Sequence, residues 1–243
     1  ITDQPDNGSL GPITGTTCTG ATPNSCTATV AYTPNPNFFG TDTFVYRADD
    51  GISPSNPATV TITVTPVNDE PSFTSGGDVT VNEDSGAYNA AWATNVSAGP
   101  GEGSQTLTFT VSNDNTALFS SQPAVSPTGA LSFTPAADAN GSALVDVFLS
   151  DNGGTANSGD DTSPTQQFTI TVTAVNDPPT FDLGGNQTVD EDAGLQTVAT
   201  FATTFDPGPA DESGQTLVQY LVSNDTNALF SAQPAIANDA TLT

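Results

Sequence analysis

The sequence has 243 residues, of which 27 are Asp or Glu, one is Lys or Arg and none is His, so its formal net charge is −26. Such a surface repels phosphate backbones and anionic lipid head groups, which argues against nucleic acid and membrane-surface partners and favours divalent cations. Hydrophobic residues make up 35% of the chain, and no apolar run approaches the about 20 residues that span a bilayer, so several narrow cores and no membrane insertion are expected.

Cys18 and Cys26 are the only cysteines, and the residues between them are rich in turn formers. This spacing suits a local disulfide across a hairpin loop, and two free thiols are the alternative. Without His, a zinc site would lack enough nitrogen and sulfur ligands. A disulfide would place the chain in an oxidising compartment outside the cytoplasm.

Two segments alternate strictly between apolar residues and Thr, namely Val60–Val64 and Phe168–Val172. This pattern is typical of antiparallel strands with one buried and one solvated face, and we predict that each is the last strand of its domain. The chain shows no apolar recurrence at i, i+3 and i+4, so no helix is predicted. Aromatic residues expected in the cores are Trp92, Phe38, Phe39, Phe44, Phe109, Phe119, Phe133, Phe148 and Phe168.

The sequence repeats with a period close to the length of one β-sandwich domain. Residues 61–73 match residues 169–181, and 169 − 61 = 108. The match continues at the same offset from residues 81–86 to residues 189–194. A unit of about 100 residues that contains only strand and turn patterns predicts an immunoglobulin-like sandwich.

We therefore predict an all-β fold of tandem immunoglobulin-like, or cadherin-like, antiparallel β-sandwich domains in an extended array. The domains span residues 1–69, 70–177 and 178–243. The first lacks N-terminal strands and the third lacks C-terminal strands that the second contains, so both outer domains are expected to be partial. Each boundary carries a Val-Asn-Asp-x-Pro segment, whose proline stiffens an extended linker.

The chain resembles the tandem immunoglobulin-like or cadherin-like repeats of very large bacterial surface and secreted proteins, including repetitive adhesins. The segments that carry the resemblance are Val67–Pro71, Val175–Pro179, Asn82–Asp84, Asp190–Asp192 and Tyr32–Phe44. The resemblance covers nearly the whole chain. It implies a fold and a repeat class, but modules of this kind serve as spacers, adhesins and structural fibres alike.

Acidic loops are expected to meet at the joint between the second and third domains, because alternate loops of a sandwich lie at opposite ends. The second domain would contribute its turn 82–84, its loop 138–140 and the linker itself. The third domain would direct its turn 206–212 toward the same linker. The candidate ligands are Asn82, Glu83, Asp84, Asp138, Asn176, Asp177, Asp206, Asp211 and Glu212.

The same reasoning gathers a second set at the first joint, formed by Asn68, Asp69, Glu70, Glu102 and Asp151 together with Asn35 and Asn37. Ca²⁺ takes about six to eight oxygen ligands, so we predict Ca²⁺ at the joints and a rod that this ion makes rigid. The alternatives are that the Asn-Asp and Asp-Gly pairs only form turns and that the acidic residues only solvate the surface.

The composition also bears on function, because general acid–base and nucleophilic catalysis most often use His or Lys, and neither is present. We expect a non-catalytic, extracellular or cell-surface repeat module, a calcium-rigidified spacer or adhesion segment of a large bacterial surface protein. Its partners would be neighbouring repeats of the same chain, and other copies if it forms a filament. The alternatives are a structural subunit of an extracellular filament, sheath or surface layer, and ancillary domains of a secreted enzyme.

Overall fold

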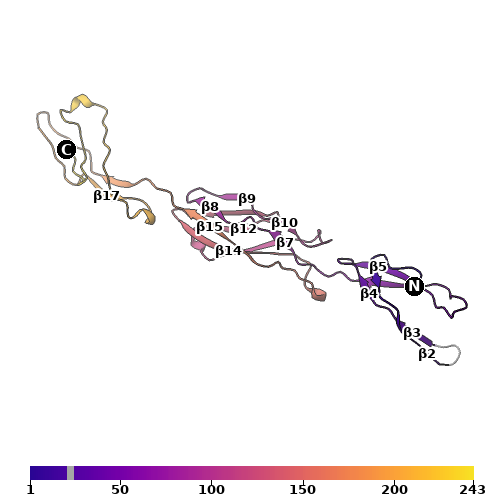
Figure 1. Cartoon of the computed structure of the whole chain (residues 1–243). Helices are drawn as coiled ribbons and strands as arrows, with labels where there is room; N and C mark the ends of the chain where they lie inside the picture. The colour runs from indigo at the N-terminus through magenta and orange to yellow at the C-terminus, as the bar shows by residue number, and fades with distance from the viewer. Residues whose placement is uncertain (21–24) are drawn as a thin grey trace.

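The computed structural model describes residues 1–20 and 25–243, and this part of the chain is all-β, with short 3₁₀ turns and no α-helix. The strands form three groups that follow one another end to end (Figure 1). Among the described residues, no strand of one group pairs with a strand of another. We refer to residues 1–69, 70–177 and 178–243 as the N-terminal, central and C-terminal segments. No described helix is long and apolar enough to cross a membrane.

The central segment is an immunoglobulin-like sandwich of two main sheets. Its strands are β7 (Ser72–Thr74), β8 (Val79–Asn82), β9 (Tyr88–Ala91), β10 (Thr94–Ser97), β11 (Thr108–Asn113), β12 (Phe119–Val125), β13 (Ala130–Pro135), β14 (Gly141–Ser150) and β15 (Gln166–Thr173). One sheet has the order β11-β14-β15-β8 and the other β12-β13-β9, while β7 pairs with β10 alone. A 3₁₀ turn, η1 (Thr116–Leu118), precedes β12, and η2 (Ala156–Ser158) lies between β14 and β15.

One pairing departs from the antiparallel prediction, because β8 runs parallel to β15. The first stretch of the segment is divided into two short strands, β7 and β8, which join different partners. Gly76 and Gly77 lie between them, and Gly77 has a positive φ of 82°. The chain therefore crosses from one sheet to the other at a glycine pair and places β8 beside the last strand of the sandwich.

Period-2 alternation separates the core face of β14 from its outer face. Val145, Val147 and Leu149 are all 0% exposed, whereas Leu144 is 42% exposed. Phe148 has the outward parity and is only partly buried, so the prediction that it belongs to the core is wrong. The same alternation buries Phe168 in β15, as the sequence predicts.

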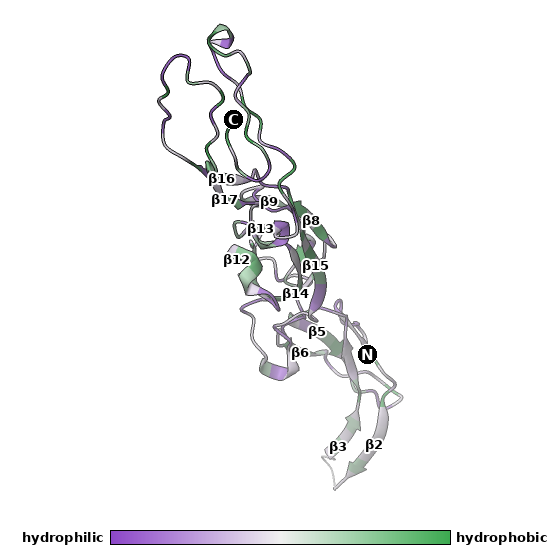
Figure 2. Cartoon of the chain, turned by 90° about the vertical axis from the view of Figure 1, so that its left-hand side faces the viewer, coloured by the Kyte–Doolittle hydropathy of each residue, from purple (hydrophilic) through white to green (hydrophobic). Residues whose placement is uncertain are grey.

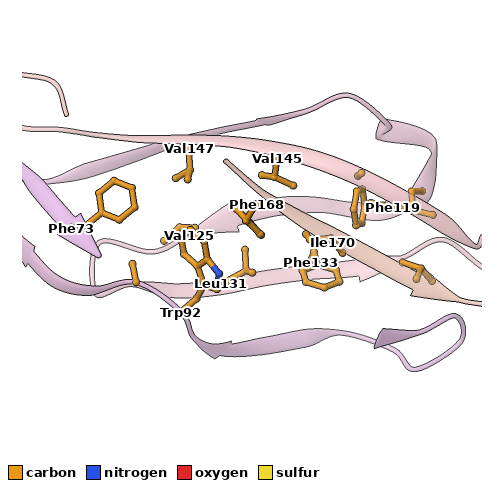
Figure 3. Packing of buried hydrophobic residues seen from close by; sticks show 14 of the residues in the cluster. Phe73, Trp92, Phe119, Val125, Leu131, Phe133, Val145, Val147, Phe168 and Ile170 are labelled. Carbon is orange, nitrogen blue, oxygen red and sulfur yellow. The ribbon is translucent and has the colours of Figure 1, made fainter. Parts of the chain in front are cut away.

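The core of the sandwich is an aromatic and aliphatic cluster between the two sheets (Figure 3). Trp92 is 4% exposed, lies 4.4 Å from Phe168 between ring centroids, and donates its indole N–H to the Gly77 carbonyl at 2.8 Å. Trp92 is therefore the core residue that the sequence predicts. Burying a side chain of this size contributes roughly 2 to 3 kcal/mol or more, and its polar N–H also has the partner that burial requires.

Three pairs of strands build the N-terminal segment: β1 (Gly8–Leu10) with β4 (Tyr32–Pro34), β2 (Thr14–Thr19) with β3 (Ser25–Thr29), and β5 (Gly40–Tyr46) with β6 (Ala58–Val64). A disulfide joins Cys18 to Cys26 across β2 and β3, which confirms the predicted bridge. Residues 21–24 of the predicted hairpin turn lie outside the described residues. Phe44 is buried, but Phe39 is 54% exposed beside the first joint, so its prediction as a core residue is wrong.

A buried carboxylate organises the N-terminal segment. Asp42 is 4% exposed and accepts hydrogen bonds from the backbone N–H groups of Asp6, Asn7 and Thr43 and, at 2.9 Å, from the Tyr32 hydroxyl. Desolvation opposes ionisation, but the hydrogen bond from Tyr32 and those from the backbone outweigh it and lower the pKa of Asp42. The ionised side chain thus connects β5 to the chain that enters β1.

The C-terminal segment contains one strand pair, β16 (Thr180–Leu183) with β17 (Ala202–Asp206), and the 3₁₀ turns η3 (Ala210–Glu212) and η4 (Asn227–Leu229). Apolar residues recur along its loops (Figure 2). Phe73 of the central segment is 7% exposed, but its counterpart Phe181 is 45% exposed. Phe73 lies between two core rings, with centroids 6.5 Å from Trp92 and 5.0 Å from Phe109, whereas the ring contact of Phe181 is to Tyr220 at 5.3 Å.

Candidate metal centre

Glu83 is the first residue after β8, and it bonds to the linker that follows β15. Because the two strands are parallel, with Asn82 opposite Thr173, their carboxyl ends lie at the same edge of the sheet. The backbone N–H of Glu83 donates to the Thr173 carbonyl at 2.9 Å, and the Glu83 carboxylate accepts the N–H of Val175 at 2.7 Å. The strand register therefore holds an acidic side chain against the linker.

The Glu83 carboxylate is only 2% exposed, and polar contacts compensate its burial. Its second oxygen lies 3.4 Å from the amide nitrogen of Asn140, which precedes β14. Glu83 thus connects three parts of the central segment: the end of β8, the loop between β13 and β14, and the exit linker. The structure brings these three parts together at one end of the sandwich, as the sequence predicts.

Three further carboxylates gather at this joint. Oxygens of Asp84, Asp138 and Asp177 all lie within 4.8 Å of one another. Asp84 and Asp138 have positive φ angles of 56° and 55°. Asp adopts this left-handed conformation more readily than most residues, so two tight turns direct both side chains toward the linker.

The C-terminal segment contributes Glu212, at the end of η3. Its Oε1 accepts a short hydrogen bond from the backbone N–H of Asp177, and the side chain is 4% exposed. Gln215 donates its side-chain N–H to Oδ1 of Asn176 at 2.9 Å. The C-terminal segment therefore forms hydrogen bonds to the linker residues Asn176 and Asp177, whereas the central segment forms one to Val175.

Two buried oxygens at this joint have no hydrogen-bond partner, Oδ2 of Asp177 and Oε2 of Glu212. Desolvation raises the pKa of Asp177, and the negative charges of Asp84, Glu212, Asp138 and Glu83 raise it further. Five carboxylates thus lie close enough to repel one another, and no cationic side chain is among the groups that act on Asp177. A bound cation would satisfy the unpartnered oxygens and offset the repulsion.

At the first joint, the central segment bonds to the linker in the same way as the C-terminal segment bonds to the second linker. Glu102 accepts the backbone N–H of Asp69, with distances of 3.3 and 3.2 Å to its two oxygens. Gln105 donates to Oδ1 of Asn68 at 2.7 Å. Glu102 and Gln105 are the counterparts of the Glu and Gln that bond to the second linker, so the sequence repeat is also a repeat of linker contacts.

Asp151 joins the first linker to the turn after β14. Its Oδ1 accepts the side-chain N–H of Asn68 at 3.0 Å and the backbone N–H of Gly153 at 2.8 Å. Oδ2 of Asp151 and Oε1 of Gln105 are buried and have no hydrogen-bond partner. This joint therefore also has oxygens available for a ligand.

The two joints differ in charge at one equivalent position. Thr33, Pro34 and Gly40 recur in the central segment as Thr134, Pro135 and Gly141, which aligns Asn37 with Asp138. These two residues share a positive φ, 59° and 55°. Asn37 lines a groove of about 370 Å³ with Asp69 and Glu102. An amide thus stands at the first joint where a carboxylate stands at the second.

Four predicted ligands occupy other environments. Asn82 accepts the Thr173 hydroxyl at 2.6 Å on the strand ladder, and Asp206 accepts the N–H of Gly208 at 3.2 Å within its own turn. Glu70 and Asp211 are exposed. Asp206 and Asp211 are not among the charges that raise the pKa of Asp177.

The candidate ligands that sequence reasoning missed are Gln105 and Gln215. A signal was present, because the Gln-Thr-Leu triplets at residues 105–107 and 215–217 recur between the repeats. An uncharged side chain on a loop resembles ordinary solvated polar sequence, and only the structure shows that both amides reach a linker Asn.

The atoms that could coordinate a metal at both joints are carboxylate and amide oxygens, and the chain has no His. Hard divalent cations prefer this set, and Ca²⁺ tolerates irregular arrangements of it better than Mg²⁺ does. The buried, unpartnered oxygens of Asp177 and Glu212 supply the property that distinguishes such a site from a solvated acidic surface. The residues present therefore fit a calcium ion.

The N-terminal segment has a match among known families. A sequence model described as a bacterial Ig domain matches residues 2–63. The match spans β1 to most of β6 and agrees with the immunoglobulin-like sandwich of the central segment. Bacterial Ig domains are generally non-catalytic and are commonly exposed at the cell surface. No curated protein matches the chain.

Proposed function

We propose that the chain is a non-catalytic, extracellular repeat module whose joints bind Ca²⁺, and that it serves as a stiff spacer or adhesion segment of a large bacterial surface protein. One observation carries the proposal. Asp84, Asp138 and Asp177 converge at the second joint, where Glu212 is buried with an unpartnered oxygen.

The ion would be held by Asp84, Asp138, Asp177 and Glu212, which come from both sides of the linker. Its chemical contribution is positive charge that offsets the mutual repulsion of these carboxylates. Glu83 and Glu212 bond to linker N–H groups from opposite sides, so both segments already contact the three residues 175–177. Weaker repulsion strengthens these contacts and restricts bending.

The disulfide and the charge support an extracellular location. Cys18 and Cys26 are bonded, and structural disulfides persist in oxidising compartments. A net charge of −26 keeps such a chain soluble and repels anionic surfaces. The matching bacterial Ig domain points the same way.

The proposal is tested by comparing the metal-free chain with the chain in Ca²⁺. We expect a higher melting temperature and, in small-angle scattering, a narrower distribution of overall dimensions with Ca²⁺. Glu212→Gln should remove the part of both responses that comes from the second joint. Asp182→Asn, which deletes an exposed carboxylate on β16, is the matched control and should retain them. Identical melting and scattering with Ca²⁺ and with a chelator would refute the proposal.

A further inference from the structure

The N-terminal segment carries a hairpin that the central segment lacks. In the central segment, β12 and β13 are joined by a tight turn over residues 126–129. The corresponding strands β1 and β4 are joined by residues 11–31, which include β2 and β3. Inserted loops tolerate change and often carry functions separate from the core they extend.

The inserted hairpin has two open edges. Every residue of β2 and β3 is exposed, and the two strands form a sheet of their own in the described part of the chain. Figure 1 shows β2 and β3 projecting away from the rest of the N-terminal segment. Unpaired edges present backbone N–H and carbonyl groups to any strand that approaches.

The hairpin also lacks the charge that usually protects an open edge. No charged residue occurs from Asn7 to Thr41, in a chain whose net charge is −26. Native proteins commonly block edges with Lys, Pro or a bulge. Two copies of this chain repel each other along the acidic parts of the rod. The electrostatic repulsion between them is therefore weakest where the two uncharged hairpins approach each other.

The two edges are not equal. The pairing of β2 with β3 shifts between Thr14 and Thr17, and Gly15 within that shift has a φ of 65°. Such a bulge twists a strand and makes its edge a poor template. β3 has no positive φ among its described residues, so its edge from Ser25 to Thr29 is the better template.

The disulfide identifies the backbone groups that face outward on β3. Cys18 and Cys26 are directly opposite, with a Cα–Cα distance of 4.1 Å, which is typical of a pair that does not exchange hydrogen bonds. The N–H and carbonyl of Cys26 therefore point to the open edge. Those of the next residue, Thr27, point toward Thr17.

We propose that β3 is a self-association strand, which pairs antiparallel with β3 of a second copy. A two-fold axis near Thr27, the central residue of β3, makes the contact self-complementary. A contact of one short strand buries far less than the about 1,000 Å² of a stable interface, so the association is weak and concentration-dependent.

Sedimentation analysis of the whole chain over a wide concentration range tests this. We expect reversible dimerisation that strengthens as ionic strength rises, because salt screens the repulsion between the acidic rods. Thr27→Asp should weaken dimerisation by about tenfold or more, because it places like charges opposite each other. Thr61→Asp, at an exposed position on β6, is the matched control and should dimerise as the parent does.

Amide hydrogen exchange of the unmodified chain keeps the proposal testable if the variant perturbs the hairpin. The Cys26 amide should become protected as concentration rises, while the Thr27 amide should be protected at every concentration. A chain that stays monomeric, or dimers that persist in Thr27→Asp with an unprotected Cys26 amide, would overturn the proposal. Dimers that require Ca²⁺ and leave the Cys26 amide unprotected would place the contact at the joints and overturn it equally.

Discussion

The Glu83 carboxylate accepts a 2.7 Å hydrogen bond from the backbone N–H of Val175, 92 residues further along the chain. The bond depends on the parallel pairing of β8 with β15, which brings the end of one strand to the exit of the other. It joins the first part of the central segment to the linker that leaves it. Contacts made by this residue should therefore affect both stability and joint geometry.

Glu83→Ala should destabilise the central segment by about 1 kcal/mol, because it removes a partly buried hydrogen bond to the N–H of Val175. Denaturant unfolding followed by Trp92 fluorescence measures this. Glu83→Gln keeps an oxygen that can accept the bond, so it should lose less stability. Equal unfolding midpoints for Glu83→Ala and the parent would show that the bond contributes nothing.

Gly76→Ala should destabilise the same segment by about 1 to 3 kcal/mol. A Cβ at residue 76 would lie 2.5 Å from the Trp92 carbonyl oxygen and 2.7 Å from its ring, and the backbone cannot move away cheaply. Gly103→Ala is the control, because a Cβ there meets no atom within 4 Å and its φ is not positive. The two variants should differ in thermal unfolding, and matching curves would contradict the packing described for Trp92.

Asp42 should make the N-terminal segment sensitive to acid. Its folded pKa is lowered, so its contribution is present above its ordinary pKa near 3.8 and is lost as pH falls through the lower folded value. Asp42→Asn should remove that part of the acid dependence and lower stability at neutral pH. Amide exchange of β5 residues between pH 2 and pH 6 reports it, and an unchanged acid profile in the variant would contradict the assignment.

Asp177 should have the opposite pH dependence in metal-free buffer. Its folded pKa is raised, so the favourable contribution of the protonated form is present below the ordinary value near 3.8 and is lost as pH rises through the raised value. Order at residues 175–177 should therefore decrease with rising pH, and Asp177→Asn should flatten the change. Amide chemical shifts of these residues follow it, and an order that rises with pH would be inconsistent with a repulsive cluster.

The charge difference between the joints predicts unequal ion affinity. The second joint has Asp138 where the first has Asn37, and calcium affinity depends on the number of charged ligands. Asn37→Asp should raise the affinity of the first joint by about tenfold and leave the second unchanged. Calcium titrations resolved by residue-specific chemical shifts measure both, and no gain at the first joint would exclude residue 37 as a ligand.

Much of the fold follows from the sequence because its signals are local and repeated. Alternation in Val60–Val64 and Phe168–Val172 predicts the strands, and the offset of 108 predicts the repeat. The parallel partner of β8 is not predictable in this way, because register between residues 91 positions apart is set by packing. The aromatic character of Phe148 predicts burial, but its position in the alternation of β14 places it on the outer face.

The candidate site is predictable in part for the same reason. Acidic turns at Asp84 and Asp138 and the linker Asp177 could be brought together from chain order alone, and the structure places them within 4.8 Å. Gln105 and Gln215 could not be chosen among many polar loop residues. Their role depends on how the following segment lies against the linker, which no local pattern encodes.

Calorimetric titration of Ca²⁺ into the metal-free chain tests the central claim most directly. We predict saturable binding with a tighter site at the second joint, and we predict that Asp177→Asn and Glu212→Gln each abolish that tighter site while Asp182→Asn retains it. Titration without saturable binding, or binding that is unchanged in both joint variants, would contradict the account of these carboxylates as ligands.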